Sequence, residues 1–148
     1  MIRFREATRA DVAAVVALLS DDALGARREG TELDAYLAAF DRMQDEGANR
    51  LIVGEVGGRI VATYQLTFIS GLSLRASRRA QVESVRVASD RRGQGLGAAM
   101  FADAEARARA AGRRLMQLTM NATRTDARRF YERLGFTASH IGFKRDLS

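Results

Sequence analysis

The sequence of 148 residues contains no cysteine. A disulfide framework, a thiolate zinc site and a cysteine nucleophile are therefore excluded. No stretch approaches the roughly 20 apolar residues of a membrane span, and the N-terminus lacks the apolar run of a secretory signal. We therefore expect a cytoplasmic protein that does not enter a membrane. No set of His, Asp and Glu residues has the spacing of metal ligands, so no metal site is predicted.

Lysine is also scarce, because Lys144 is the only lysine and all other basic residues except one histidine are arginines. The net charge of +6 favours contact with anions. Arginine binds phosphate through a planar fork, so the composition suits a phosphorylated cofactor as well as a nucleic acid. A nucleic-acid-binding module is therefore one alternative, but the sequence shows none of its usual motifs, and solvated surface positions explain most of the arginines equally well.

The N-terminal half of the sequence predicts a short strand and two helices. Ile2–Phe4 has the composition of a strand. Thr8 and Asp11 form a capping-box pattern ahead of the first helix, and Thr31 is placed to cap the second. Apolar residues repeat at helical spacing in both helices: Val12, Val15, Val16 and Leu19 in the first, and Leu33, Tyr36, Leu37 and Phe40 in the second.

The remaining elements are mostly strands, interrupted by two helices. Gly57-Gly58 predicts a hairpin turn, and residues 70–80 predict an exposed loop. The predicted strands are 51–56, 60–69, 81–87, 115–120 and 137–144, and the predicted helices are 96–111 and 127–134. This order, βααβββαβαβ, predicts an α/β fold with one mixed sheet in a single domain spanning residues 1–148.

A glycine loop joins the strand at Val85 to the long helix at Leu96. Gly93, Gly95 and Gly97 alternate with larger residues. Glycine lets a ligand approach the backbone, and the start of a helix presents unpaired N–H groups, so the loop predicts a pyrophosphate site. The P-loop ending is absent, and the loop does not follow the first strand as in Rossmann folds. The alternative is an ordinary tight turn.

The sequence resembles the GNAT superfamily of N-acetyltransferases at two motifs. Arg92 to Gly97 matches the family's Gln/Arg-x-x-Gly-x-Gly/Ala signature, and Phe130 to Phe136 matches its Phe-Tyr-x-x-x-Gly-Phe run. The detailed resemblance starts at Gln81, whereas the first half matches only in the order of its elements. It implies a mostly antiparallel twisted sheet flanked by helices, with acetyl-CoA as co-substrate and direct transfer of acetyl to a primary amine of a small molecule or peptide. A homodimer is one expected form.

The resemblance also implies where the cofactor lies. It places the backbone N–H of Val85 near the acetyl carbonyl and Val87 beside the pantetheine arm. Many members have asparagine where this chain has Arg124, which either reaches a cofactor phosphate or is a solvated residue near a helix start. The implied cofactor-binding residues are Val85, Arg86, Val87, Arg91, Arg92, Gly93, Gln94, Gly95, Leu96, Gly97, Ala98, Arg124, Phe130 and Tyr131.

Acetyl transfer needs a deprotonated amine, a stabilised oxyanion and a protonated leaving thiolate. Tyr131 resembles the family's general acid, with core packing as the alternative role. Glu83 is the candidate base, with an ion pair to Arg86 or another arginine as the alternative. His140, the only histidine, ranks below Glu83.

The acceptor amine is left open by the sequence. An amino acid, a polyamine, an aminoglycoside, a xenobiotic amine and a protein N-terminus all satisfy the chemistry. Four acidic residues could attract a cationic amine, although solvated loop charges explain them equally well: Asp21, Asp22, Glu29 and Glu32. An acetyl-CoA sensor without catalysis is the remaining alternative.

Overall fold

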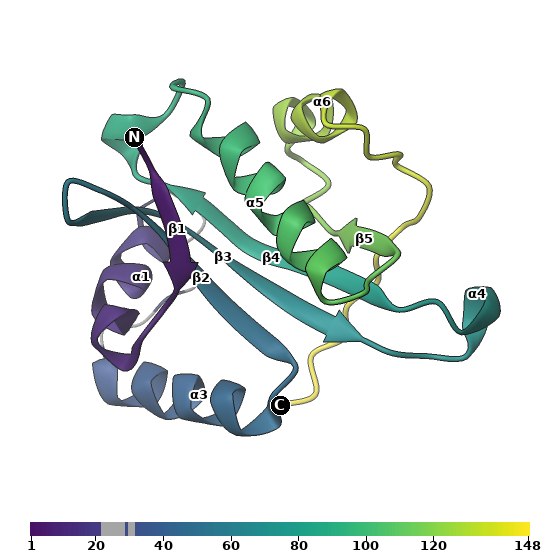
Figure 1. Cartoon of the computed structure of the whole chain (residues 1–148), viewed down its shortest axis with the longest axis horizontal. Helices are drawn as coiled ribbons and strands as arrows, with labels where there is room; N and C mark the ends of the chain where they lie inside the picture. Colours follow the sequence, from purple (N-terminus) through teal and green to yellow (C-terminus); the bar gives the residue numbers. More distant parts are fainter. Residues whose placement is uncertain (22–28, 30–31) are drawn as a thin grey trace.

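The computed structural model describes residues 1–21, 29 and 32–148 (Figure 1). A single sheet has the strand order β1-β2-β3-β4-β5, in which β4 and β5 are parallel and all other neighbours are antiparallel. This confirms the predicted mixed, mostly antiparallel sheet. The strands are β1 (Arg3–Glu6), β2 (Asn49–Val56), β3 (Arg59–Ile69), β4 (Arg79–Val87) and β5 (Leu115–Leu118).

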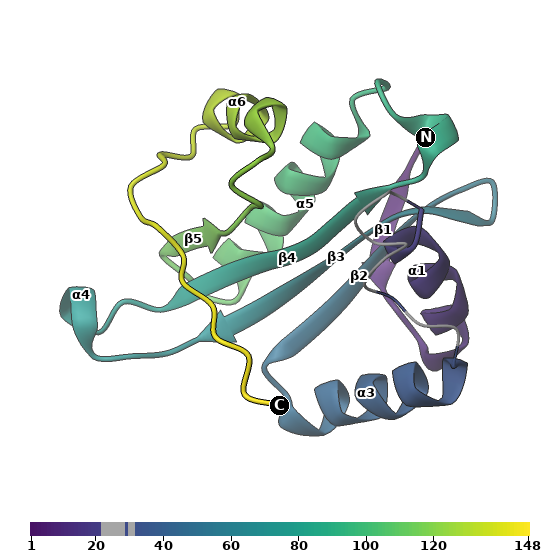
Figure 2. The ribbon, with the colours of Figure 1, turned by 180° about the vertical axis from the view of Figure 1, so that it is seen from behind.

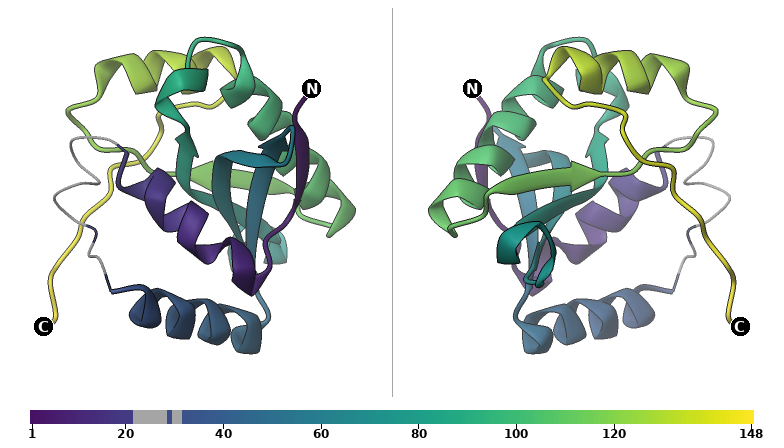
Figure 3. Two further views of the ribbon diagram at one scale, coloured as in Figure 1. Left: turned by 90° about the vertical axis from the view of Figure 1, so that its left-hand side faces the viewer. Right: turned by 90° about the vertical axis from the view of Figure 1, so that its right-hand side faces the viewer.

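Helices cover both faces of the sheet (Figures 1 and 3). The longer ones are α1 (Val12–Leu19), α3 (Leu33–Glu46), α5 (Leu96–Ala110) and α6 (Thr125–Arg133), and the short turns are η1 (Arg9–Asp11), α4 (Ser73–Ala76) and η2 (Ser89–Arg91). Among the described residues, no helix combines the length and the apolar character needed to cross a bilayer. Of the predicted helix signals, Thr31 lies outside the described residues, and α3 starts at Leu33.

The alternation of side chains along β3 builds a core on each face of the sheet. Tyr64 and Leu66 are buried against α5, whereas Val61 points the other way and packs against Leu18 of α1. Successive side chains of a strand point to opposite faces, so a central strand between two helical layers is apolar on both sides. The hydroxyl of Tyr64 donates to Asp103 on α5 at 2.6 Å, which ties this helix to the sheet.

The start of the first helix carries the predicted carboxylate cap. The backbone N–H of Thr8 donates to Asp11 Oδ2 at 2.7 Å, and Arg5 Nη1 donates to the same oxygen at 2.7 Å. The hydrogen bonds from Arg5 hold the pKa of Asp11 down at about 2. The cap therefore also joins β1 to η1 and α1.

The prediction of a last strand over residues 137–144 is wrong. After α6 the chain continues to Ser148 without regular structure (Figure 2). Residues 137–148 are all exposed. A strand forms only against a partner strand, whatever the composition of its own sequence. Within the described residues, no strand pairs with this segment.

Candidate active site

The two parallel strands at the edge of the sheet diverge. Their pairing ends where Val82 meets Leu118, whereas β4 continues to Val87. Beyond Val82, the edge of β4 that faces β5 has no strand partner among the residues that the structure describes. A gap therefore lies between the two strands, and it is bordered by the unpaired edge of β4.

Backbone groups of Val85 and Val87 point into this gap. The N–H of Ala88 donates to the carbonyl of Val61 on β3 at 2.8 Å. Since successive residues of a strand direct their backbone groups to opposite edges, those of Val87 and Val85 face away from β3. Their carbonyls accordingly accept side-chain hydrogen bonds, from Arg92 Nε at 3.3 Å to Val87 and from Arg86 Nη1 at 2.9 Å to Val85.

A bulge at Ser84 brings β4 into this orientation. Ser84 has a φ of 54°, and the pairing of β3 with β4 shifts between Thr63 and Gln65. The extra residue lets Val82 before it and Val85 after it both pack toward the α5 side of the sheet. No glycine or proline marks this position, so the bulge was not predictable from the residue types.

The glycine loop lies between the end of β4 and the start of α5. Gly93 and Gly95 each have a φ of +78°, and a Cβ added at either would meet nothing within 4 Å. Glycine is therefore required by the backbone angles, and the space above the loop is open. The hydrogen bond from Ala99 N–H to the Gly95 carbonyl is part of the first turn of α5, so the preceding N–H groups of Leu96, Gly97 and Ala98 remain available for an anion.

Arginines brace the loop and supply positive charge around it. Arg92 donates to the carbonyls of Val87 and Asp21, at 3.3 and 3.2 Å, so its side chain fixes the loop in this structure. Arg59 Nη1 forms an ion pair with Asp90 Oδ2 at 2.7 Å. Arg91 is half-buried, and Gln94 is exposed. The loop geometry thus rests on contacts with β3 and with the end of α1.

The second sequence motif packs directly on the first. A Cβ added at Gly97 would lie 3.0 Å from Cζ of Phe130, so glycine at this position permits the close approach of α6 to α5. Phe130 also contacts Phe101 of α5 edge to face, with 6.1 Å between the ring centroids. The structure therefore brings the glycine loop and the aromatic motif side by side.

Tyr131 is half-buried among aromatic rings beside this contact. Its ring lies 5.5 Å from Phe101 and 6.2 Å from Phe136, centroid to centroid. Burial raises the pKa of Tyr131, and the positive charges of Arg124 and Arg86 oppose that rise. The phenol is therefore neutral at pH 7, and two cations act on it. Arg124 is exposed and directly precedes α6, so its position agrees with either predicted role.

Glu83 lies on the sheet face opposite α5, at the end of a short chain of amides. Gln117 Nε2 on β5 donates to Gln81 Oε1 at 2.8 Å, and Gln81 Nε2 donates to the carboxylate of Glu83. Neither glutamine was predicted as a site residue. Gln81 could have been found from the sequence, because Gln81 and Glu83 are two positions apart on one strand and so share a face. The Glu83 carboxylate is exposed and held from one side by an amide.

A small apolar cavity of about 110 Å³ lies beside Glu83, between the sheet and the helices α1 and α3. Gln65, which is paired with Glu83 across β3 and β4, and Ser84 form part of its lining. Val15, Phe40 and Leu51 contribute much of its apolar wall. The cavity and Glu83 together form a candidate acceptor site.

The structure also gives positions for His140 and for three of the four acidic residues that were predicted to attract an amine. His140 is exposed on the C-terminal segment and shares a hydrogen bond with Ser139. Asp21 accepts the backbone N–H of Ser89 at 3.1 Å, so it contacts the segment that leads into the glycine loop. Glu29 accepts the hydroxyl of Tyr36, Glu32 directly precedes α3, and Asp22 lies outside the described residues.

Comparisons with known proteins identify relatives of this chain in sequence and in fold. The acetyltransferase (GNAT) family model matches residues 13–136. A transcriptional regulator from Bacillus halodurans C-125 is 42% identical, with a TM-score of 0.94 over 99% of this chain and 100% of that one. A putative acetyltransferase from Agrobacterium tumefaciens strain C58 is 24% identical, with a TM-score of 0.87 over 97% of this chain and 99% of that one.

An aminoalkylphosphonate N-acetyltransferase from Salmonella typhimurium is 40% identical over 67 residues. The match covers 45% of this chain and 44% of that protein, so the chain spans less than half the length of this relative.

Proposed function

Because this chain belongs to the acetyltransferase (GNAT) family, whose acetyltransferases use acetyl-CoA, we propose that it transfers acetyl from acetyl-CoA to a primary amine. The observation that carries the proposal is the bare edge of β4 next to the glycine loop. The N–H groups of Val85 and Val87 suit the amide-containing pantetheine arm, as a neighbouring strand would. The start of α5 suits the pyrophosphate, and the open space above Gly93 and Gly95 leaves room for it.

The proposed reaction uses groups on both faces of the sheet. The amine nitrogen attacks the thioester carbonyl carbon, and Glu83 takes a proton from the amine directly or through water. The N–H of Val85 stabilises the oxyanion. The carbon–sulfur bond then breaks, and Tyr131 donates its phenolic proton to the departing thiolate. The positive charges near Tyr131 favour the transient phenolate.

The acceptor site favours a small amine with both polar and apolar parts. Glu83 attracts a cationic amine, the amides of Gln81 and Gln117 offer hydrogen bonds, and the cavity accepts a small apolar group. Because the Salmonella relative is an aminoalkylphosphonate N-acetyltransferase, aminoalkylphosphonates are the first compounds to try. Their phosphonate group also suits an arginine-rich protein.

The direct test is release of the coenzyme A thiol from acetyl-CoA in the presence of a panel of amines. The panel contains aminoalkylphosphonates, amino acids, polyamines, aminoglycosides and peptides with free N-termini. We expect amine-dependent release above the background without amine for at least one class. Binding of acetyl-CoA without turnover of any amine would instead support a sensor.

The relative described as a transcriptional regulator favours a second candidate, the binding of a nucleic acid. The net charge of +6 is compatible with it. The match, however, covers 100% of that solved chain. The solved chain therefore has no DNA-binding domain beyond the part that resembles this protein. A mobility-shift assay across salt concentrations separates a specific complex from non-specific attraction of charge.

Glu83→Gln is expected to leave acetyl-CoA affinity unchanged and to lower turnover at neutral pH by about 10²-fold. The loss should shrink at alkaline pH, because an amine with a pKa of about 10 then deprotonates without help. A pH profile of kcat measures the loss of turnover, and calorimetry measures the affinity for acetyl-CoA. Glu105→Gln is the matched control, since Glu105 is an exposed carboxylate on α5 paired with Arg109. Full neutral-pH activity of Glu83→Gln would remove Glu83 from the mechanism.

A further inference from the structure

Four polar side chains follow one another on the sheet face opposite α5. Arg79, Gln81 and Glu83 are alternate residues of β4 and so share this face. Gln117 of β5 is paired with Gln81. Arg79 Nη1 donates to Gln117 Oε1 at 3.5 Å. Gln117 Nε2 donates to Gln81 Oε1 at 2.8 Å, and Gln81 Nε2 donates to Glu83 Oε1. The amide chain of Gln117 and Gln81 therefore has a cation at one end and a carboxylate at the other.

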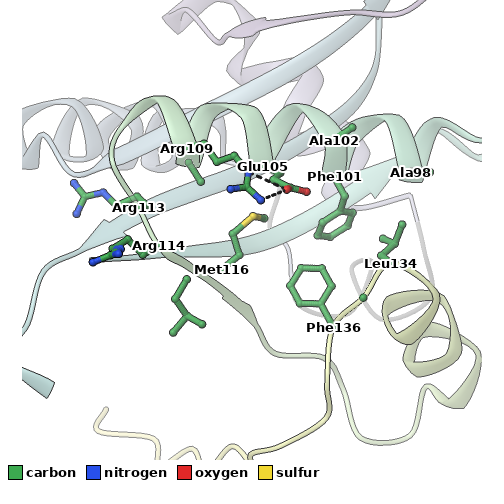
Figure 4. Close-up of a pocket in the computed structure, with 13 residues that line it drawn as sticks. Ala98, Phe101, Ala102, Glu105, Arg109, Arg113, Arg114, Met116, Leu134 and Phe136 are labelled. Carbon is green, nitrogen blue, oxygen red and sulfur yellow. Dashed lines mark hydrogen bonds and ion pairs between the residues drawn. The ribbon is translucent and has the colours of Figure 1, made fainter. Parts of the chain in front are cut away.

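The side chain of Gln117 points away from α5. Its neighbour Met116 lies on the α5 side, where it lines a groove of about 460 Å³ together with Phe101 (Figure 4). Successive side chains of a strand point to opposite faces, so Gln117 lies on the other side of the sheet. The pair of Gln81 and Gln117 is also the last but one before β4 and β5 diverge. The amide chain therefore crosses from β5 to β4 next to the gap between the two strands.

The two ends of this row determine which way each amide faces. A guanidinium can only donate hydrogen bonds, and an ionised carboxylate can only accept them. Each glutamine between them must therefore turn its carbonyl oxygen toward Arg79 and its amino group toward Glu83. If either amide were reversed, two donors would meet on one side of it and two oxygens on the other. Because hydrogen bonds in a chain polarise one another, the charge of Arg79 strengthens the final bond to Glu83.

The amide chain holds one oxygen of Glu83 and leaves the other available. Gln81 donates to Oε1, whereas Oε2 accepts no hydrogen bond from any described residue. Within the same part of the chain, Glu83 makes no direct ion pair, and Arg79 reaches it only through the two amides. A guanidinium in direct contact with a carboxylate favours the charged form and makes the carboxylate a weaker base. Neutral amides fix the position of a carboxylate without that contact.

We propose that Arg79, Gln117 and Gln81 position Glu83 for removal of the amine proton. This inference rests on the proposed function, in which Glu83 is the base. Holding Oε1 restricts the rotamers of an exposed glutamate, so that Oε2 meets the attacking amine in one orientation, and correct orientation speeds a reaction. The proton is transferred to Oε2, and the amide chain keeps all of its own protons. The three residues act through Glu83 and are positioning residues.

Gln117→Glu reverses the amide chain without changing the shape of the side chain. The new carboxylate lies next to the guanidinium of Arg79, so the variant should fold normally. Both neighbours of Gln81 are then carboxylates, and its amino group can face only one of them. We expect kcat with a saturating amine to fall roughly tenfold, because Glu83 loses its fixed position. Gln44→Glu is the matched control, since it makes the same chemical change on an exposed residue of α3 and should keep the parent kcat.

A double substitution separates positioning from a general loss of structure. Adding Gln117→Glu to Glu83→Gln should lower kcat no further, because no carboxylate remains at position 83 to be positioned. A second disruption, Gln81→Met, keeps the length of the side chain but removes the amide, and it should lower kcat by a similar factor. If the effects of Glu83→Gln and Gln117→Glu multiply, or if Gln117→Glu and Gln81→Met both keep the parent kcat, the proposal is overturned.

Nuclear magnetic resonance tests the amide chain without any acceptor amine. A side-chain amide proton of Gln81 that bonds to a carboxylate should resonate downfield of a solvated amide. Both Glu83→Gln and Gln117→Glu should move this signal upfield, and a signal unchanged in both would overturn the proposal. Absence of turnover with every amine would overturn the proposed function, and with it the role of the amide chain. A shifted signal together with the parent kcat in Gln117→Glu would overturn this inference alone.

Discussion

Tyr131→Phe is expected to slow acetyl transfer by about 10²-fold or more while changing acetyl-CoA affinity far less. The substitution removes one hydroxyl and keeps the ring that packs on Phe101 and Phe136. If the phenol protonates the leaving thiolate, the loss appears in the chemical step. Single-turnover kinetics measure that step directly. An acetyl thioester with a more acidic thiol should rescue the variant more than the parent, because its thiolate leaves without a proton.

Tyr64→Phe is the matched control for Tyr131→Phe. The Tyr64 hydroxyl is buried and donates to Asp103 at 2.6 Å, and it has no role in the proposed reaction. Its loss should lower the free energy of unfolding by about 2 kcal/mol, because a hydrogen bond to a charged group is removed, and leave turnover unchanged. Tyr131→Phe should show the opposite pattern. Equal single-turnover rates for Tyr131→Phe and the parent would assign Tyr131 to packing alone.

Gly95→Asp is expected to weaken acetyl-CoA binding at least tenfold more than Gly95→Asn does. Both side chains meet the same φ of +78° and the same open space, so the backbone strain is shared. They differ in charge, and a carboxylate beside a pyrophosphate costs roughly 1–4 kcal/mol at about 4 Å, depending on the local dielectric. Calorimetry with acetyl-CoA compares the two variants.

Thermal unfolding separates this effect from a damaged fold. Gly95 directly precedes α5, and a negative charge at a helix start stabilises the helix. Gly95→Asp should therefore be at least as stable as Gly95→Asn while binding the cofactor less well. Equal affinities of the two folded variants would show that this loop does not hold the pyrophosphate.

Local sequence patterns predicted most of the helices and strands. They also predicted the part of the candidate site that contains the glycine loop and the aromatic motif. The glycine loop was predictable because Gly93 and Gly95 adopt positive φ angles that few other residues tolerate. The aromatic motif was predictable because Phe130 packs on Gly97, which couples two short segments of fixed composition. The mixed sheet followed from the order of its elements.

The remaining features depend on contacts between distant segments. The amide chain joins Gln117 on β5 to Gln81 on β4, and only the parallel register of the two strands brings them together. The final strand was predicted over residues 137–144, but no strand of the described chain pairs with this segment. A sequence pattern specifies which face of a strand is apolar, and it does not specify which edge receives that strand.

The extra residue at Ser84 marks the one position of β4 where a change of length leaves the faces of the strand unchanged. If Ser84 were deleted, Val82 and Val85 would be two positions apart in a regular strand, so Val85 and Val87 would still face the core around Phe101. A deletion at any other position of β4 would instead turn the residues beyond it to the opposite face. When related sequences are aligned, a gap at Ser84 therefore keeps core residues matched with core residues, whereas a gap elsewhere in β4 would equate core residues with acceptor-facing ones.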